Sequence, residues 1–210
     1  MLTHPGMKLY MAPGSCSTGI HILLEELELP FEAWIVNLPA GDHRKPEYLA
    51  INPKATIPTL VRDDGSALTE FQAIAWWLAR RYPQARLLPD DADGEARVIE
   101  VMSYVVGTIH GQGYTRIFTT DGYTDDPAEH AVVQARGREI VEQGFALMNG
   151  LLAGREYVAG SFSIADAALF YVEFWADRIG IDLPENCLAH YRRMRARPVV
   201  QRVLAEEGYR

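Results

Sequence analysis

The sequence predicts an α/β unit with a small mixed sheet, followed by an all-α, purely helical region. Up to about Pro89, short apolar runs typical of strands alternate with helical runs. The pair Asp64-Gly65 separates two of the apolar runs, which indicates a β-hairpin. Beyond Pro89 the apolar periodicity is helical throughout, so no further strand is expected.

The elements of the first half follow in order along the chain. A helix is expected directly after Cys16 and another from about Glu70 to Tyr82. Because a helix connects the first two strands, these should pair in parallel, and the hairpin should add two antiparallel strands. The expected strands are Lys8–Ala12, Trp34–Asn37, Thr59–Arg62 and Ala67–Thr69.

The second half begins after a connection bounded by two prolines, and its acidic residues suit a helix N-terminus. Ser163, followed three residues later by Asp166, has the spacing of a capping box, so we interpret this pair as a folding signal. The expected helices are about 91–117, 128–152, 163–178, 184–196 and 198–207. The expected organisation is a tail at 1–6, an α/β domain at 7–83, a linker at 84–90 and a helical domain at 91–210.

Composition excludes several function classes. The net charge of -8 argues against nucleic acid as a partner. The two cysteines, Cys16 and Cys187, form no disulfide framework and no metal-binding pattern, which fits a reducing compartment. The sequence has no apolar run long enough for a membrane span and no signal-peptide pattern at its start. We therefore expect a cytoplasmic protein without a metal and without a membrane partner.

Cys16 lies where a strand runs through a Pro-Gly turn into a helix. The positive end of the helix dipole and the unpaired backbone N–H groups there favour a thiolate. This placement predicts a reactive sulfur, but an inert buried cysteine fits it equally well.

Pro58 precedes an expected strand, where a proline cannot donate a ladder hydrogen bond. A cis bond before Pro58 would turn the N–H and C=O of Ile57 outward, where an extended peptide-like ligand can pair with them. An ordinary proline at the start of a strand explains the residue equally well.

His110 lies on a mostly apolar helix, where a lone histidine is usually a packing residue. Gly107, Gly111 and Gly113 surround it, although each glycine weakens a helix by about 1 kcal/mol relative to alanine. These glycines indicate either a close approach of backbones or room for a ligand.

Five motifs occur together, and in this order they resemble those of the cytosolic glutathione S-transferases, most closely the bacterial beta class. The resemblance covers essentially residues 7–210. It implies a thioredoxin-like N-terminal domain that binds glutathione and a helical domain that supplies most of the pocket for a hydrophobic electrophile. It also implies a homodimer that acts in detoxification. The motifs are MKLYMAPGSCS, INPKATIP, LTEFQAIAWWL, IHGQGYTRIF and SFSIADAALF.

The resemblance assigns roles to residues of the first half. Cys16 matches the beta-class cysteine beside the glutathione sulfur, and Ser17 adjoins it as a helper donor. Ile57, before Pro58, matches the residue whose backbone pairs with the cysteinyl part of glutathione. Glu70 matches the acid that holds the γ-glutamyl amine. Because a second cysteine is missing after Cys16, any disulfide exchange should use glutathione as the resolving thiol.

In the second half, the resemblance matches His110 to a histidine that points toward the cysteine. Tyr114 and Phe118, one turn apart just beyond His110, are the candidates that line the electrophile pocket. Phe71 departs from the family, which commonly has a serine or glycine there. A phenylalanine cannot donate a hydroxyl to the γ-glutamyl carboxylate, and its ring could narrow the site.

Two classes of function fit these residues. The first is an enzyme that joins glutathione to electrophiles or exchanges thiols through Cys16, with an isomerase, dehalogenase or lyase as variants on the same scaffold. The second is a non-catalytic binding or regulatory protein with weakened glutathione affinity. Phe71 favours the second class, whereas the set of Cys16, Pro58, Glu70 and His110 favours the first.

Overall fold

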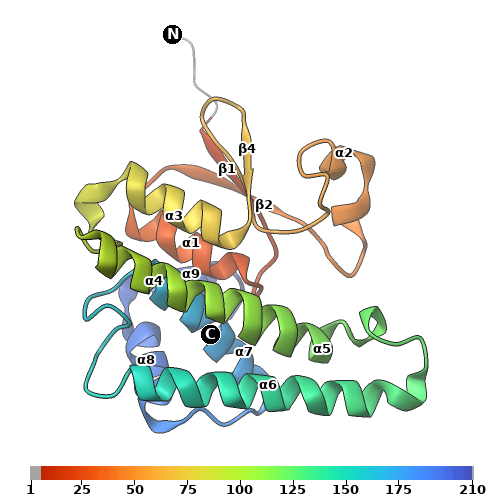
Figure 1. Cartoon of the computed structure of the whole chain (residues 1–210). Coiled ribbons are helices and arrows are strands. Elements are labelled where there is room, and N and C mark those ends of the chain that lie inside the picture. The colour runs from red at the N-terminus through yellow and green to blue at the C-terminus, as the bar shows by residue number, and fades with distance from the viewer. Residues whose placement is uncertain (1–5, 210) are drawn as a thin grey trace. The chain divides into compact units, whose positions relative to one another are not determined.

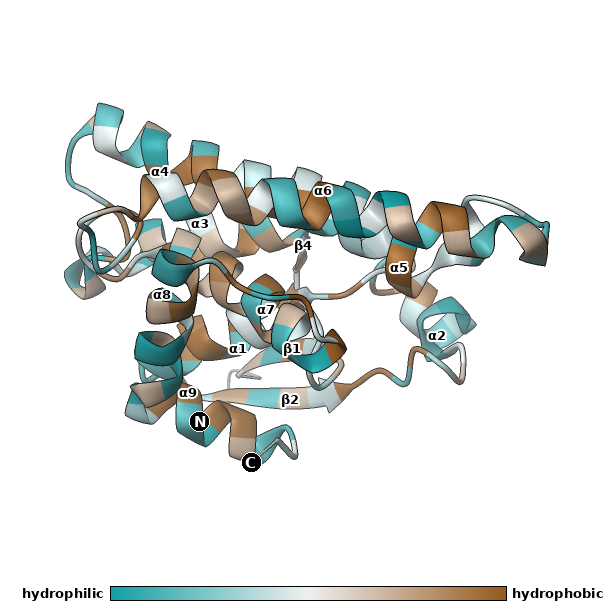
Figure 2. Cartoon of the chain, turned by 90° about the horizontal axis from the view of Figure 1, so that it is seen from below, coloured by the Kyte–Doolittle hydropathy of each residue, from teal (hydrophilic) through white to brown (hydrophobic). Residues whose placement is uncertain are grey.

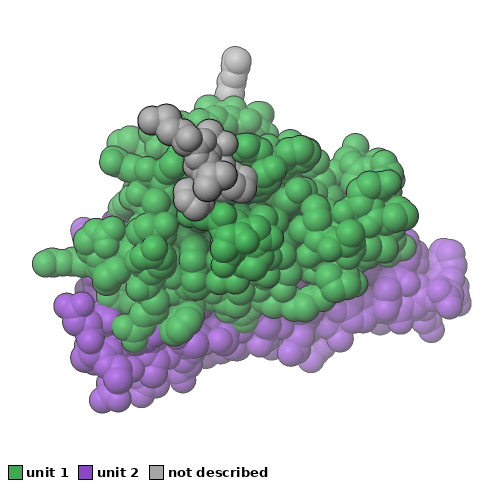
Figure 3. All heavy atoms as spheres, turned by 90° about the horizontal axis from the view of Figure 1, so that it is seen from above, with its two compact units in different colours: residues 1–88, 196–210 green, residues 89–195 purple. Residues whose placement is uncertain are grey.

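The computed structural model describes residues 6–209 of the chain (Figure 1). These residues form two compact units, coloured separately in Figure 3. Within the described residues, the first unit consists of 6–88 together with 196–209, and the second of Pro89–Arg195. Most of the expected tail at 1–6 lies outside the described residues.

A mixed four-stranded sheet forms the centre of the first unit. Its strands are β1 (Met7–Met11), β2 (Phe31–Ile35), β3 (Thr59–Val61) and β4 (Ala67–Thr69), in the spatial order β2-β1-β3-β4. The pair β1–β2 is parallel, while β1–β3 and β3–β4 are antiparallel, so the predicted mixed sheet is confirmed. The second strand begins earlier than predicted, because Phe31 already pairs with Met7 at the start of β1.

Four α-helices accompany this sheet: α1 (Ser17–Glu26), α2 (Pro46–Leu49), α3 (Phe71–Arg81) and α9 (Pro198–Glu206). The helix α1 packs against both α3 and α9 (Figure 1). The side chains of Leu9, Ile20, Leu60 and Ile74 are fully buried and form part of the core. The last helix thus packs in the first unit, whereas the sequence places it in a helical domain at 91–210. Those domain boundaries stay a prediction.

The second unit is helical. It contains α4 (Ala92–Tyr104), α5 (Thr115–Phe118), α6 (His130–Leu151), α7 (Ile164–Ile179) and α8 (Glu185–Ala196). A π-helical segment, Val105–Tyr114, joins α4 to α5, so the single helix expected at 91–117 is interrupted by wider turns. The helix α6 alternates hydrophilic and hydrophobic positions along its length (Figure 2). No helix within residues 6–209 is long and apolar enough to span a membrane.

Small residues bring the π-helical segment close to α6. A Cβ atom on Gly113 would lie 2.7 Å from Cγ2 of Val141, and one on Gly144 would lie 2.5 Å from Cγ1 of Ile109. Real Cβ atoms essentially never lie this close to another atom, so a larger residue at either position would force the neighbouring side chain to shift. A Cβ atom on Gly137 of α6 would lie 2.7 Å from the backbone oxygen of Gly113, so the predicted close approach of backbones is present at Gly113.

Candidate active site

Cys16 is the N-cap residue of α1, at the junction of strand, turn and helix that the sequence predicts. Its side chain is almost completely buried, and its Sγ donates a hydrogen bond to the carbonyl oxygen of Ile57 at 3.6 Å. This geometry suits a thiol that donates to a carbonyl oxygen.

Burial raises the pKa of the Cys16 thiol to about 12. The backbone N–H groups of Cys16 and Ser17 lower this pKa, and the nearby carboxylate of Glu70 raises it, but desolvation is the largest effect. The helix N-terminus thus favours the thiolate, as the sequence indicates, but burial, which the sequence does not show, has the larger effect on the pKa of Cys16.

Ile57 is half-buried, and the peptide bond between Ile57 and Pro58 is cis. Of the two interpretations of Pro58, the structure thus agrees with the one that expects a cis bond. Two side chains fix the backbone just before it. Asn52 donates from Nδ2 to the carbonyl oxygen of Thr56 at 2.8 Å, and the hydroxyl of Tyr48 donates to the same oxygen. Asn52 is fully buried, and nothing in the sequence assigned it this task.

Glu70 is the N-cap of α3 and has a backbone conformation that is rare outside glycine, with φ 72° and ψ 127°. Such conformations cost on the order of 1–3 kcal/mol and cluster at functional sites. Its exposed carboxylate accepts a hydrogen bond from Nζ of Lys54 at 2.8 Å. Sequence reasoning found Glu70 but missed Lys54, because only the fold brings a residue sixteen positions away to this carboxylate.

Two expectations for neighbouring residues change in the structure. The hydroxyl of Ser17 lies 2.6 Å from that of Ser15 and accepts a hydrogen bond from the backbone N–H of Ala12 at 3.1 Å. Ser17 therefore stabilises the loop before α1, which does not support the helper role. Phe71 is only 3% exposed, so its ring lies in the interior instead of standing in an open site.

In the second unit, His110 lies within the π-helical segment, a kind of distortion that is frequent at functional sites. Its Nδ1 is 3.1 Å from the hydroxyl oxygen of Tyr171. Its ring packs edge to face against the ring of Trp175, with the two ring centroids 4.9 Å apart. Burial lowers the pKa of His110 to about 4, so the imidazole is neutral at neutral pH.

The two predicted pocket residues lie in different environments. Phe118 is 48% exposed, whereas Tyr114 is fully buried and donates its hydroxyl to the carbonyl oxygen of Val172 at 2.7 Å. The two rings stack with centroids 5.4 Å apart. Tyr114 therefore packs against Phe118 from the interior of the second unit. Because Tyr114 is not exposed, the expectation that Tyr114 lines an open pocket is not supported.

A buried cluster in α7 and α8 was missed by the sequence analysis. His190 places Nδ1 2.8 Å from Glu173 and Nε2 3.2 Å from Asp166, and all three side chains are excluded from solvent. Asp166 also forms the predicted capping box with Ser163. The capping pattern is visible in the sequence, but the histidine that completes the cluster lies far along the chain and carries no local signal.

One group within residues 6–209 has the composition of a metal site, namely His21, Glu25 and Glu206. Glu25 forms an ion pair with Arg202, and His21 contacts Glu206 at 3.3 Å. Two of the three carboxylate and imidazole groups thus already contact each other, and the third is paired with an arginine.

The fold is a thioredoxin-like α/β unit with a cysteine at its first helix and a cis-proline before β3, joined to a helical unit. Residues 14–81 match the family model "Glutathione S-transferase, N-terminal domain", and residues 131–205 match "Glutathione S-transferase, C-terminal domain". The chain belongs to the glutathione S-transferase family.

Individual relatives are similar along nearly the whole chain. Glutathione S-transferase GstA from Escherichia coli O157:H7 is 35% identical over 96% of this chain and 99% of that relative. A Sulfitobacter glutathione transferase homologue, solved with bound glutathione, is 29% identical with a TM-score of 0.90, covering 98% of this chain and all of its own. The beta class enzyme from Sphingomonas chungbukensis is 32% identical with a TM-score of 0.82, covering 96% and 98%.

Proposed function

We propose that this protein is a glutathione transferase that joins glutathione to hydrophobic electrophiles. The single observation that carries the proposal is the contact between Cys16 and Ile57, where the sulfur lies 3.6 Å from the carbonyl oxygen. A peptide that pairs with the backbone of Ile57 by strand addition lies within reach of the Cys16 sulfur. The glutathione bound in the Sulfitobacter neighbour supports the same ligand class.

Glu70 and the beginning of α3 are proposed to hold the γ-glutamyl end of glutathione. The exposed carboxylate of Glu70 suits the ligand's amine. In the structure this carboxylate already pairs with a cation, the ammonium group of Lys54. Backbone N–H groups at the N-terminus of α3 suit a carboxylate. These groups replace the hydroxyl that Phe71 lacks, so the departure at Phe71 leaves binding intact.

Cys16 is proposed to act as a thiol beside the glutathione sulfur. A thiolate there would repel the glutathione thiolate, whereas a protonated Cys16 whose S–H turns from the carbonyl oxygen of Ile57 to the ligand sulfur would donate a weak hydrogen bond to it. In the conjugation step the glutathione thiol loses its proton to solvent and its sulfur bonds to the electrophilic carbon. The leaving group departs with the bonding electron pair. The attacking species is the thiolate of glutathione.

Thiol-disulfide exchange is the second proposed activity, because Cys16 stands at the N-terminus of α1. The Cys16 thiolate would attack the glutathione sulfur of a mixed disulfide between glutathione and another thiol, form a Cys16–glutathione disulfide and release the other thiol. The thiolate of a second glutathione would then attack the glutathione sulfur of that disulfide, which forms oxidised glutathione and regenerates Cys16. The high pKa of Cys16 makes this route slow at neutral pH.

The electrophile is proposed to bind near Phe118, whose ring is half exposed and backed by Tyr114 and Trp175. An aromatic surface of this kind suits an apolar ligand. His110 is proposed to contribute a neutral hydrogen-bonding group held in place by Tyr171.

The remaining proposals rest on membership of the family. We infer a homodimer, a cytoplasmic location and a role in detoxification. The non-catalytic alternative is not favoured, because its main support was Phe71, and that residue is buried.

Calorimetric titration of the reduced protein with glutathione tests the function. The key variant is Glu70→Gln, and the matched control is Glu100→Gln, another exposed carboxylate in an ion pair with a basic residue. A hydrogen bond between charged groups contributes about 1.5–3 kcal/mol, so Glu70→Gln should weaken binding roughly tenfold or more. Absence of binding by the wild-type protein would leave the transferase proposal without support.

A further inference from the structure

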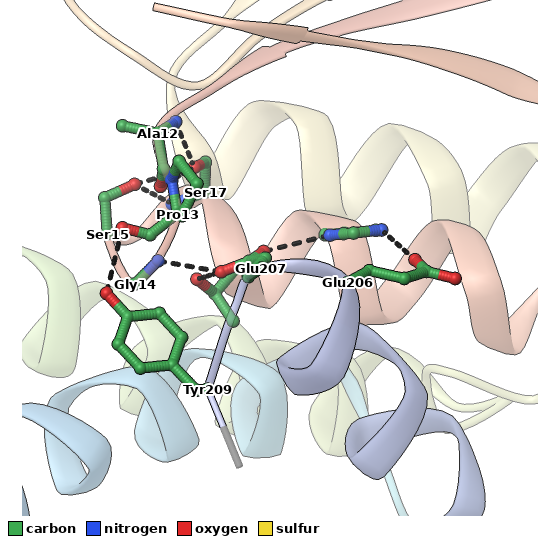
Figure 4. Close-up of polar contacts among 10 residues, drawn as sticks. Ala12, Pro13, Gly14, Ser15, Ser17, Glu206, Glu207 and Tyr209 are labelled. Carbon is green, nitrogen blue, oxygen red and sulfur yellow. Dashed lines mark hydrogen bonds and ion pairs between the residues drawn. The ribbon is translucent and has the colours of Figure 1, made fainter. Parts of the chain in front are cut away.

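The end of the chain forms a turn that directs two side chains toward the loop before Cys16. The N–H of Gly208 donates to the carbonyl oxygen of Ala205 at 3.1 Å, and the N–H of Tyr209 donates to that of Leu204 at 2.7 Å. With Gly208 at φ 86°, these two bonds make a Schellman motif at the end of α9. Figure 4 shows Glu207 and Tyr209 beside the loop.

Glu207 contacts the chain on both sides of Cys16. Its Oε2 accepts a hydrogen bond from the backbone N–H of Gly14 at 2.7 Å (Figure 4). The same oxygen accepts a hydrogen bond from Oγ1 of Thr18, also at 2.7 Å. Its Oε1 lies 2.9 Å from Nδ1 of His21. The side chain of Glu207 is only 2% exposed. A buried carboxylate with three partners is firmly placed, because loss of the partners would leave a desolvated charge.

Tyr209 covers the same loop from outside. A Cβ atom on Gly14 would overlap the Tyr209 hydroxyl, so the ring packs directly on the glycine backbone. The hydroxyl also lies 3.4 Å from the carbonyl oxygen of Pro13. The loop therefore has contacts from Glu207 and Tyr209, both of which follow the last helix.

We propose that Glu207 is a positioning residue for Cys16, acting through Gly14 and Thr18. Its value for catalysis rests on the proposed function of Cys16, but the positioning itself is a property of the first unit. By holding the residues two positions before and two after Cys16, the carboxylate keeps the sulfur buried against Ile57. A displacement of about 1 Å at a reacting group can cost a rate factor on the order of a hundred.

The two cysteines of the chain make a direct test, because each reports on one unit. Cys16 and Cys187 are both buried and both free. The experiment measures the rate at which N-ethylmaleimide labels each cysteine in the folded protein, with the two sites separated by peptide mass spectrometry. The test variant is Glu207→Ala. The matched control is Glu206→Ala, the neighbouring residue, which contacts His21 at 3.3 Å and has a half-exposed side chain.

In Glu207→Ala, Cys16 should be labelled at least about tenfold faster than in the wild-type protein and in Glu206→Ala. The rate of labelling of Cys187 should be the same in all three proteins. Glu207→Gln should restore most of the protection, because an amide can still accept from Gly14 and Thr18. Equal labelling of Cys16 in wild type and Glu207→Ala overturns the proposal. A parallel rise at both cysteines also overturns it, since that is the mark of general destabilisation.

Thr18→Val provides the milder variant if Glu207→Ala does not fold. It removes one partner of the carboxylate with little change of volume, and Cys16 alone should again label faster. Calorimetry with glutathione separates this proposal from the function. If wild type fails to bind glutathione, the transferase proposal falls, whereas the labelling rates still decide whether Glu207 positions Cys16.

Discussion

The sulfur of Cys16 and the carbonyl oxygen of Ile57 are joined by a 3.6 Å hydrogen bond within the first unit. The two residues come from separate motifs, one at the start of α1 and the other just before β3. Their contact brings these two motifs together, and its geometry suits a thiol that donates to the carbonyl oxygen.

The pH dependence of Cys16 reactivity follows from its burial. Because its pKa is raised to about 12, the thiolate fraction should increase about tenfold per pH unit between pH 7 and 10. The rate of alkylation by iodoacetamide at Cys16, followed by mass spectrometry, should rise over this range without levelling. A plateau near pH 8 would show that the helix N-terminus outweighs desolvation.

The cluster of His190, Glu173 and Asp166 should make stability depend on pH. Burial by itself lowers the pKa of His190, but the two carboxylates raise it to about 10. A histidine with a raised pKa contributes stability that is complete below its ordinary value of 6.5 and is lost as the pH rises through 10. Burial also raises the pKa of Glu173 from 4.5 to about 7, so the contribution of this carboxyl is lost below the window in which His190 titrates. Tm should therefore fall between pH 7 and pH 10.

His190→Ala tests this cluster near neutral pH. Breaking a buried charge pair costs about 3–5 kcal/mol, so the free energy of unfolding in urea should fall by that order. Arg136→Ala is the control, because it breaks an exposed pair with Glu139 and should cost less than about 1 kcal/mol. Similar losses in the two variants would contradict the assignment of a charged pair.

Ser163→Ala should lower the free energy of unfolding by about 1 kcal/mol and leave glutathione affinity unchanged. Ser163 is buried, and its backbone N–H and hydroxyl both donate to Asp166, at 2.8 Å and 2.7 Å. Asp166→Ala should lower the free energy of unfolding more than Ser163→Ala does, because Asp166 also accepts a hydrogen bond from the backbone N–H of Val158. Urea unfolding and calorimetry check the two statements separately, and a change of affinity in Ser163→Ala would refute the folding role.

Phe71→Ser should destabilise the protein instead of opening its site. Replacing a buried phenylalanine with a small residue costs about 3–5 kcal/mol, and Phe71 is 3% exposed. Trp76 lies on the same helix and is 43% exposed, so Trp76→Ser should lower the free energy of unfolding less than Phe71→Ser does. Glutathione affinity, measured on the folded fraction, should not increase in Phe71→Ser. A clear gain of affinity would mean that the ring closes the site.

Gly14→Ala should be more harmful than Gly41→Ala, although both glycines have a positive φ, 71° and 76°. At Gly41 an added methyl group meets no atom within 4 Å, so only the backbone cost remains. At Gly14 it would also overlap Tyr209. Tm should therefore fall further in Gly14→Ala, and adding Tyr209→Ala should remove most of the difference. Equal losses in both single variants would show that Tyr209 does not press on the loop.

Much of the architecture is predictable because its signals are local. The alternation of short apolar runs indicated the strands, and the Asp64-Gly65 pair indicated the hairpin between β3 and β4. The capping box at Ser163 marked the start of α7 within one residue. The motif around Pro58 also indicated the start of β3, although the sequence did not decide between a cis bond and an ordinary proline at the start of a strand.

The sequence by itself determined the order of elements, the family and the identity of Cys16, Ile57, Glu70 and His110 as candidates, because periodicity, caps and motifs act over a few residues. The tertiary structure alone decided the protonation of Cys16, the burial of Tyr114 and the contacts of Glu207. Desolvation depends on every atom packed around a group, and hydrogen bonds between distant segments exist only once the chain has folded.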